Sequence, residues 1–576
     1  MRDLRTATGG GWGRGIAVGL ALMIAIVGCS RPAHREPEVD AGADGSPRLM
    51  NRIPDQFATA GRSKTVVDLR RYYPGLKAAR LVEGPSNAVI RDGTLQLTPS
   101  APQHASVLVE LTVHGESLRD HLWYAVQPQK APSYPLQVSR NNRYLVDAAG
   151  DPVIIHGDAA WELPTNTTED EARTYFRDRQ QRGMTAGIWR IITTAFTDQR
   201  PFHENAYGKP PFTSTVGDAL NFTAPNAAYW QYVDWCIREA YKHGYLVFAA
   251  PAYIGYKNGN QGWTEALLAN GPRRMRAYGR WLGSRYVAYP NIIWVAGGDS
   301  ELREEAPMHD AMMDGLVTGE AEAAGRLVHL ITAKSKRGRS ALDDYDSPWL
   351  TVNATYSKTT AVASKVRDDY SVRGRVLPTL LIEGWYENEH GMTPLQLRQQ
   401  AYWALLEGAA GHIFGNCPVW SFGGAPWFCD DQDRGVEASY DSEGAESMQH
   451  LSALLSTRTL LHDGGAYLDV DRGELITAGK GAPGTAAYVA ARYNGRTAVA
   501  YLPREQPITV DLSRLEAAQG SVRAVWYDPS TGTVTTDGWY ATAGLRALTP
   551  PGSGDWVLLL DDAALDVPLP GSGARP

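Results

Sequence analysis

Two carboxylates in this 576-residue chain follow apolar segments closely, and they are the candidates for acid–base catalysis. Asp299 follows Asn291–Ala296 and a Gly-Gly pair, and Glu383 follows the apolar run 380–382. Glu383 directly follows its apolar run and is therefore partly desolvated, which costs free energy unless the group has a role. The two glycines before Asp299 let the backbone approach closely, which favours a functional role, although Asp299 could instead cap the following helix. A pair of carboxylates can hydrolyse a glycosidic bond, because one protonates the leaving oxygen while the other attacks the sugar or activates water. Glu387 has the same strand parity as Glu383 and is the alternative second carboxylate.

Aromatic and polar side chains stand at the ends of the other apolar segments. The chain has 17 Trp and 28 Tyr but only 10 Phe. Trp and Tyr combine a flat apolar face with one polar atom, which suits stacking on sugar rings, although a large barrel core would use the same residues. Asp158, Trp161, His412 and Asn416 could equally belong to structural networks. The candidate substrate-binding residues are Asp158, Trp161, Trp189, Tyr253, Trp385, Glu387, His412, Asn416 and Trp420.

The elements that must position these residues begin near residue 135, where apolar strands alternate with amphipathic helices. Eight such strands predict a (β/α)8 barrel, whose active site lies at the C-terminal ends of the strands. Thr168 with Glu171, and Thr393 with Gln396, are capping pairs that start two of the helices. The fifth and sixth strands are so close in sequence that their linking helix must be short or missing. The predicted strands are Val153–His156, Ala186–Ile192, Tyr245–Ala250, Asn291–Ala296, Leu327–Ile331, Leu350–Asn353, Thr379–Glu383 and His412–Phe414.

Two β-rich regions flank the predicted barrel, so the fold class is α/β with additional β domains. The barrel is expected over residues 135–455. Short alternating strands over 51–130 predict an N-terminal immunoglobulin- or cadherin-like β domain, by analogy alone. From residue 456 the helices stop, and strands separated by turn sequences predict a C-terminal β-sandwich over 456–565.

The N-terminus has the features of a bacterial lipoprotein signal peptide over residues 1–29. The apolar run Gly15–Gly28 is too short to span a bilayer as a mature helix, but it fits a signal-peptide core. It ends at Cys29 in a sequence that resembles a lipoprotein box, so Cys29 is the expected lipidation site. Residues 30–50 have the composition of a flexible tether. We expect an outer-membrane lipoprotein, facing the periplasm or the cell surface; an ordinary secretory signal is the alternative.

Charge and motif content argue against several other classes. The net charge is −7 without a basic stripe, which argues against a nucleic-acid partner. The sequence has no zinc-site spacing, His-Glu-x-x-His, glycine-rich phosphate loop or Gly-x-Ser-x-Gly element, so no metal or cofactor is predicted. Cys417 and Cys429 could form a disulfide in an oxidising compartment, and Cys236 lies in a helical pattern as a buried thiol.

Four segments carry a resemblance to a known family: His156–Leu163 (HGDAAWEL), Asn291–Asp299 (NIIWVAGGD), Leu381–Glu387 (LIEGWYE) and Tyr402–Phe422. Together they resemble the apiosidase-like (β/α)8 glycoside hydrolases over about residues 135–450. The region around Val525–Pro529 is similar to the collagen-binding-type sandwich often fused to that barrel. The resemblance implies that Asp299 and Glu383 are the catalytic pair, with Asp299 as acid/base and Glu383 as nucleophile.

The function expected from these features is glycoside hydrolysis with two carboxylates. The substrate would be a plant or microbial polysaccharide, from which an exo-acting enzyme removes a terminal furanose-like sugar, such as apiose or arabinofuranose. Ser300-Glu301 and Asn353–Tyr356 depart from the family pattern, which leaves apiose itself open. The alternatives are a non-catalytic glycan-binding lipoprotein and an endo-acting glycanase. A binding protein needs neither Asp299 nor Glu383, so their presence favours an enzyme.

Overall fold

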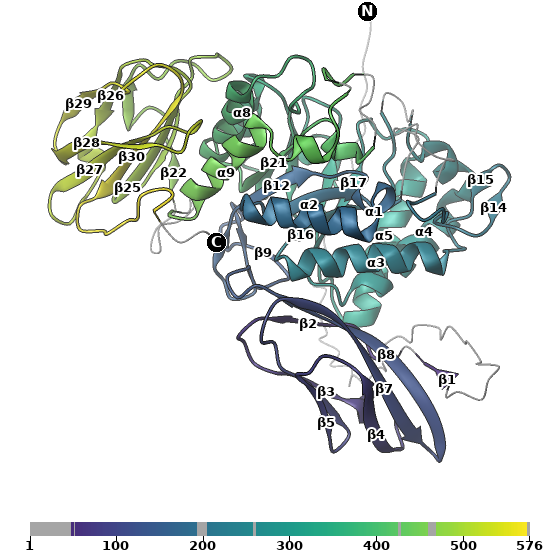
Figure 1. Cartoon of the computed structure of the whole chain (residues 1–576). Helices are drawn as coiled ribbons and strands as arrows, with labels where there is room; N and C mark the ends of the chain where they lie inside the picture. The colour runs from purple at the N-terminus through teal and green to yellow at the C-terminus, as the bar shows by residue number, and fades with distance from the viewer. Residues whose placement is uncertain are drawn as a thin grey trace, which may run out of the picture.

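The computed structural model describes residues 48–50, 52–192, 204–256, 261–423, 428–431, 433–458 and 468–572. The predicted signal peptide, Cys29 and nearly all of the predicted tether lie outside these residues. In chain order the molecule consists of an N-terminal β domain, a central barrel with its helices and a C-terminal β-sandwich (Figure 1). Within the described ranges, none of the helices combines the length and apolar character that a membrane span requires.

The central domain is a parallel eight-stranded barrel, as predicted. The sheet order is β18-β17-β16-β13-β12-β21-β20-β19, and the seam between β18 and β19 is closed by the N–H groups of Thr351 and Val352, which donate to the carbonyl of Ile331. The strands are β12 (Ile155–Ala159), β13 (Ala186–Arg190), β16 (Leu246–Ala250), β17 (Ile292–Gly297), β18 (Leu330–Lys334), β19 (Asn353–Tyr356), β20 (Thr379–Glu383) and β21 (Gly411–Phe414).

Helices cover the outside of the barrel. Capping boxes at Thr168 with Glu171 and at Thr393 with Gln396 start α2 and α8, which confirms both predicted starts. Between β18 and β19 the chain forms only the single-turn α6, so the predicted short link is also confirmed. The helices are α1 (Leu163–Asn166), α2 (Glu169–Gln181), α3 (Ala227–Lys242), α4 (Thr264–Tyr286), α5 (Ala306–Ala324), α6 (Ala341–Asp344), α7 (Ala361–Tyr370), α8 (Pro394–Leu406) and α9 (Glu443–Leu455).

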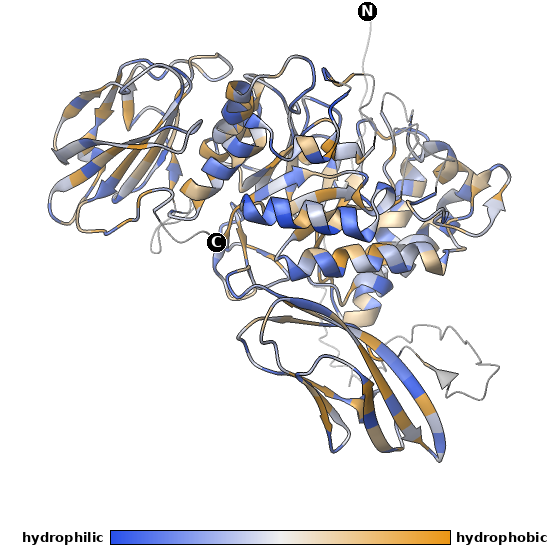
Figure 2. Cartoon of the chain, in the orientation of Figure 1, coloured by the Kyte–Doolittle hydropathy of each residue, from blue (hydrophilic) through white to orange (hydrophobic). Residues whose placement is uncertain are grey.

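The N-terminal domain consists of two β-sheets, and an immunoglobulin-like topology stays a prediction. One sheet has the order β1-β8-β7-β4 with β2 on β8, and the other has the order β3-β6-β5. Hydrophobic and hydrophilic residues alternate along β7 and β8, so one face packs on the domain core (Figure 2). The strands are β1 (Arg48–Leu49), β2 (Gln56–Thr59), β3 (Thr65–Asp68), β4 (Leu76–Glu83), β5 (Ala88–Arg91), β6 (Thr94–Leu97), β7 (Gln103–Val113) and β8 (Glu116–Gln127).

The C-terminal domain is a two-sheet sandwich that packs on α8. Arg398 of α8 donates to both carboxylate oxygens of Asp555 at 2.8 Å, and both residues are buried. The ring of Tyr402 stacks on Tyr501 with centroids 4.6 Å apart. Its sheets have the orders β22-β24-β25-β30-β27-β28 and β23-β26-β29, with strands β22 (Asp469–Val470), β23 (Ile476–Ala478), β24 (Ala490–Tyr493), β25 (Thr497–Leu502), β26 (Ile508–Asp511), β27 (Ser521–Tyr527), β28 (Val534–Ala541), β29 (Leu545–Leu548) and β30 (Trp556–Asp562).

Two small sheets lie outside these three bodies. Their strands are β9 (Gln137–Val138), β10 (Leu145–Val146) and β11 (Pro152–Val153) before the barrel, and β14 (Thr215–Val216) with β15 (Ala219–Leu220) before α3.

Candidate active site

A buried lysine joins the two predicted catalytic carboxylates at the C-terminal end of the barrel. Lys334 ends β18; its ammonium nitrogen contacts Asp299 Oδ1 and lies 3.1 Å from Glu383 Oε2. The Lys334 side chain is 2% exposed, whereas those of Asp299 and Glu383 are 17% and 11% exposed. The two carboxylates therefore reach solvent at the barrel mouth, and the ammonium lies deeper between them.

Aromatic rings enclose the same ammonium. The Lys334 nitrogen lies 4.2 Å from the ring centroid of Tyr356 and 5.6 Å from that of Trp161. Burial lowers the pKa of Lys334 from its ordinary value, and the charge of Glu383 opposes that shift. The positive charge of Lys334 between the two carboxylates offsets their mutual repulsion.

A register irregularity brings Glu383 to the mouth. Leu380 and Ile382 belong to the cluster that fills the barrel, so in a regular strand the next side chain would point toward the helices. β19 and β20 pair regularly as far as Thr355 with Leu381, but Tyr356 is then paired with Glu383 instead of Ile382. One extra residue in a strand is a β-bulge, which can re-aim a side chain beside an active site. The bulge accounts for the contact between Glu383 and Lys334.

Two glycines place Asp299 beside Lys334. Gly297 ends β17 with a φ of 83°, in the left-handed region that favours glycine. A Cβ at this position would overlap the carbonyl oxygen of Lys334 and the hydroxyl of Tyr345. The N–H of Gly298 donates to the same Lys334 carbonyl at 3.1 Å. The chain leading to Asp299 therefore lies directly against the end of β18.

An aromatic wall and a second ion pair complete the cluster. Arg190 Nη1 lies 3.1 Å from Glu162 Oε1, and both side chains are buried. The Arg190 guanidinium lies 5.3, 4.7 and 5.8 Å from the ring centroids of Trp161, Tyr253 and Trp420, respectively. Since Trp161 also contacts Lys334, these three predicted residues form one wall beside the carboxylates.

Trp385 lies at the rim of the mouth and is half-buried. The ammonium of Lys358 is 3.7 Å from its ring centroid, and the guanidinium of Arg337 is 5.6 Å away. The rim is braced by a disulfide between Cys417 and Cys429. Because Cys429 pairs with Glu389 in a β-bridge, this disulfide ties the loop after β20 to the segment after β21.

Glu387 and Asn416 hold a helix and do not join the cluster. Glu387 accepts hydrogen bonds from Asn416 Nδ2 at 2.7 Å, from Ser442 Oγ at 2.5 Å and from the N–H of Gly444 at 2.8 Å. Ser442 is the N-cap of α9, so the Glu387 carboxylate anchors the start of that helix. This corrects the expectation that Glu387 and Asn416 contact substrate.

Asp158, Trp189 and His412 also point away from the mouth. Asp158 Oδ2 accepts from Arg179 of α2 at 2.6 Å, and both side chains are completely buried. Trp189 packs in the core between strands and helices, and His412 bonds to His156, which reaches the Met448 carbonyl of α9. Alternate residues of a strand face opposite sides of the sheet, and these three occupy the helix-facing positions. The expectation of substrate contact is corrected for them as well.

The predicted site residues did not include five members of the cluster: Glu162, Arg190, Lys334, Tyr356 and Tyr386. The fifth and sixth strands were predicted to end at Ile331 and Asn353, but β18 and β19 continue to Lys334 and Tyr356. Tyr386 lies in the loop after β20, where its hydroxyl accepts the Trp161 indole N–H at 2.8 Å. In the second barrel strand, β13, Arg190 faces the mouth, whereas the predicted residue next to it, Trp189, faces the helices. The signal that could have found Lys334 is a lysine directly after the apolar run 330–333.

A third carboxyl group, Glu389, lies close enough to Glu383 to interact with its charge and is half-buried. Burial and the charge of Glu383 together raise the pKa of Glu389 to about 8. The raised pKa keeps the Glu389 carboxyl protonated and neutral below about pH 8, so the mouth carries one negative charge fewer than its residue types suggest.

We expect Glu389→Gln to gain stability relative to the wild type as the pH rises from 5 to 8.5. The folded state holds the Glu389 proton more tightly than the unfolded state, so the free energy of unfolding of the wild type falls between its ordinary pKa and about 8. Gln cannot ionise, and its relative gain should be up to about 4 kcal/mol, because each pKa unit corresponds to about 1.4 kcal/mol. Thermal midpoints of both proteins at the two pH values measure it. A difference that is the same at both, or that also arises in the exposed control Glu437→Gln, would contradict this assignment.

Among the described residues, no group of three or more His, Cys, Asp or Glu side chains is arranged to hold a metal ion. The arrangement at the mouth is instead one of paired carboxylates in an aromatic, partly desolvated setting, which suits acid–base and nucleophilic chemistry on a sugar.

Comparison with known proteins agrees with this chemistry. The family model of the apiosidase-like catalytic domain matches residues 139–462, and that of a collagen-binding-like domain of a collagenase matches residues 473–561. No curated protein matches the chain. Both domain assignments predicted from the four resembling segments and the C-terminal region are thereby confirmed.

Solved structures share the fold. A glycoside hydrolase family 5 protein from Bacteroides vulgatus is 20% identical, covers 77% of this chain and 96% of its own, and has a TM-score of 0.64. A second structure, described as a glycoside hydrolase, is 20% identical, covers 75% of this chain and 98% of its own, and has a TM-score of 0.63. At this level of identity the likeness supports the fold.

Proposed function

Because the chain belongs to the apiosidase-like family of glycoside hydrolases, we propose that it removes a terminal furanose-like sugar from a polysaccharide or oligosaccharide. Asp299 is the acid/base and Glu383 the nucleophile. The observation that carries this assignment is the single ammonium of Lys334, which contacts both carboxylates at the barrel mouth. Glycoside hydrolysis needs two carboxyl groups on either side of the scissile bond, and the shared contact with Lys334 holds Asp299 and Glu383 close enough to form such a pair.

The shared partner also favours retention of configuration. Two oxygens that both contact one nitrogen at hydrogen-bond distance are at most about 6 Å apart. Retaining enzymes place their carboxyl groups about 5–5.5 Å apart, whereas inverting enzymes need about 6.5–9.5 Å to admit water. We therefore infer that Glu383 attacks the anomeric carbon directly and that water later releases the sugar from it.

Lys334 has a defined part in this sequence. Asp299 must be protonated to donate to the leaving oxygen, and it is left as an anion when the leaving group departs. The ammonium of Lys334 lies where it stabilises that anion, and its second contact is with Glu383, the attacking group. Trp161, Tyr253 and Trp420 are packed around Arg190 and form the apolar side of the site beside this pair.

A sugar-release assay tests the proposed function. The wild type is incubated with nitrophenyl apiofuranoside, nitrophenyl arabinofuranoside and a panel of plant and bacterial polysaccharides, and the products are separated by chromatography. Monosaccharide release without intermediate oligosaccharides supports exo action on a furanose. Oligosaccharide products would indicate an endo-acting glycanase, and binding without any release would indicate a glycan-binding protein. The anomer first formed, followed by NMR, tests retention.

A further inference from the structure

A large groove lies on the outside of the barrel, separate from the mouth. Its volume is about 1390 Å³, and its lining comes from α2, the segment before α3, α3, α4, α5 and the N-terminal β domain. None of the residues that form the carboxylate cluster or its aromatic wall lines this groove. It is large enough for several sugar units, because pockets for drug-sized ligands measure about 300–1,000 Å³.

The same three-residue unit occurs three times along this groove. In each unit a guanidinium lies against an indole ring and is paired with a carboxylate. Arg238 lies 4.8 Å from the ring centroid of Trp123 and pairs with Asp55 at 2.9 Å. Arg173 lies 4.9 Å from Trp235 and pairs with Glu169 at 2.6 Å, and Arg285 lies 5.2 Å from Trp281 and pairs with Asp234 at 2.7 Å.

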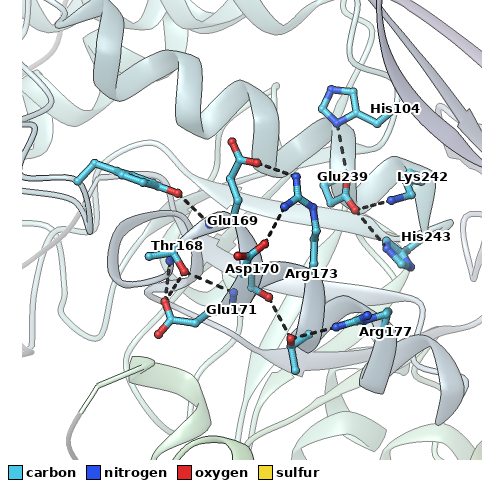
Figure 3. A network of polar contacts seen from close by, with 12 residues as sticks. His104, Thr168, Glu169, Asp170, Glu171, Arg173, Arg177, Glu239, Lys242 and His243 are labelled. Atoms are coloured by element: carbon cyan, nitrogen blue, oxygen red, sulfur yellow. Dashed lines mark hydrogen bonds and ion pairs between the residues drawn. The ribbon is translucent and has the colours of Figure 1, made fainter. Parts of the chain in front are cut away.

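The charges of the groove lining cancel. Its other two cations are also paired with lining carboxylates, Lys242 with Glu239 at 2.7 Å and Arg280 with Glu322 at 2.6 Å. Figure 3 shows Arg173 directed at Glu169 and Asp170, and Glu239 held by His104, Lys242 and His243. Burial lowers the pKa of His104 and His121, so both lining imidazoles are neutral at pH 7.

We propose that this groove binds a neutral segment of a polysaccharide, at a distance from the barrel mouth. Trp123 and Trp281 are only partly buried, so the ring surface that their guanidinium leaves uncovered can contact the C–H groups of sugars. The fixed guanidinium–carboxylate pairs offer donors and acceptors to hydroxyl groups. An acidic polymer would need unpaired cations, whereas every lysine and arginine among the described lining residues is paired with a carboxylate. That the ligand is a polysaccharide rests on the proposed function, because the groove would bind the same polymer that the active site hydrolyses.

Affinity electrophoresis tests the proposal. Full-length protein carrying Glu383→Gln, so that no polymer is consumed, is run in native gels containing arabinan, galactan or polygalacturonate. We expect retardation by a neutral polymer and none by polygalacturonate. Trp281→Ala removes one ring, and Ala277→Arg places a long charged side chain in the groove from an exposed position of α4. Each should weaken binding about tenfold, as loss of a central aromatic contact does.

Trp539→Ala is the matched control, since Trp539 is 59% exposed on β28 of the sandwich, a domain that contributes no residue to the groove lining. Thermal midpoints confirm that each variant is folded. The proposal is overturned if neither neutral polymer retards the parent protein, if both groove variants bind as the parent does, or if Trp539→Ala weakens binding equally. Failure of the wild type to release sugar in the separate assay would count against the proposed function alone.

Discussion

Glu383→Gln is expected to keep its fold and its affinity for sugar while losing nearly all turnover. The substitution conserves shape but removes the attacking charge at the barrel mouth. Loss of a nucleophile typically costs at least the 10²–10⁴-fold contributed by acid–base groups, so we expect a fall in kcat of about 10³-fold or more. Initial rates on a nitrophenyl furanoside and on the natural polymer measure it, and azide should restore part of the rate if configuration is retained.

Two comparisons make this result specific. Asp299→Asn should fail on the natural polymer but be partly spared on a nitrophenyl substrate, because nitrophenolate leaves without a proton. Glu387→Gln weakens the anchor of α9 and should lower the free energy of unfolding by about 1–3 kcal/mol. Its effect on kcat should be small in comparison with that of Glu383→Gln. Turnover near the wild-type level in Glu383→Gln would show that another carboxylate is the nucleophile.

Lys334→Met is expected to lose roughly 10²–10³-fold in kcat, the usual effect of removing one preorganised charge from an active site. Met conserves length and packs against Tyr356, but it leaves Asp299 and Glu383 without the cation that both contact. Two nearby carboxylates then compete for one proton, which raises the pKa of one of them. In a plot of kcat against pH, the fall in kcat on the acidic side should therefore occur at a pH closer to neutral than in the wild type.

The pH profile separates this role from simple packing. A lysine that only filled space would lower stability when replaced and leave the fall in kcat on the acidic side at the same pH. Lys334→Arg keeps the charge, so its kcat should fall on the acidic side at the same pH as in the wild type, even if its maximal turnover is lower. An unchanged profile in Lys334→Met would contradict the proposed electrostatic role.

The sequence was enough to predict the barrel, its capping boxes and the region of both carboxylates, but it was not enough to predict which side chains face the mouth. Strands buried on both faces are apolar throughout, so they lack the alternation from which strand parity is read. Trp189 and Arg190 are neighbours of this kind, and the prediction chose the one that faces the helices. For the same reason the end of β18 was placed at Ile331, which concealed Lys334.

Glu383 was predicted by position, although the physical reason for its orientation could not be read from the chain. Its contact with Lys334 depends on a one-residue bulge opposite Tyr356, and such bulges arise from pairing between strands rather than from local sequence. Asp299 was easier to predict, because the glycine pair before it is visible in the sequence. The close approach of Gly297 to the Lys334 carbonyl gives that pair its structural reason.

The contact between α8 and the sandwich limits how these two modules can be exchanged during evolution or engineering. Arg398 is buried, and its charge is balanced by Asp555 of the other module, so a barrel on its own would keep a guanidinium without its partner carboxylate. In the intact protein, removing only the Asp555 carboxylate would cost about 3–5 kcal/mol, because the guanidinium would stay buried without it. In a barrel on its own, Tyr402 would also lose its stacking partner Tyr501. A different C-terminal module could replace this one only if it brought a carboxylate and an aromatic face to the same two places, so the two modules are expected to be inherited together.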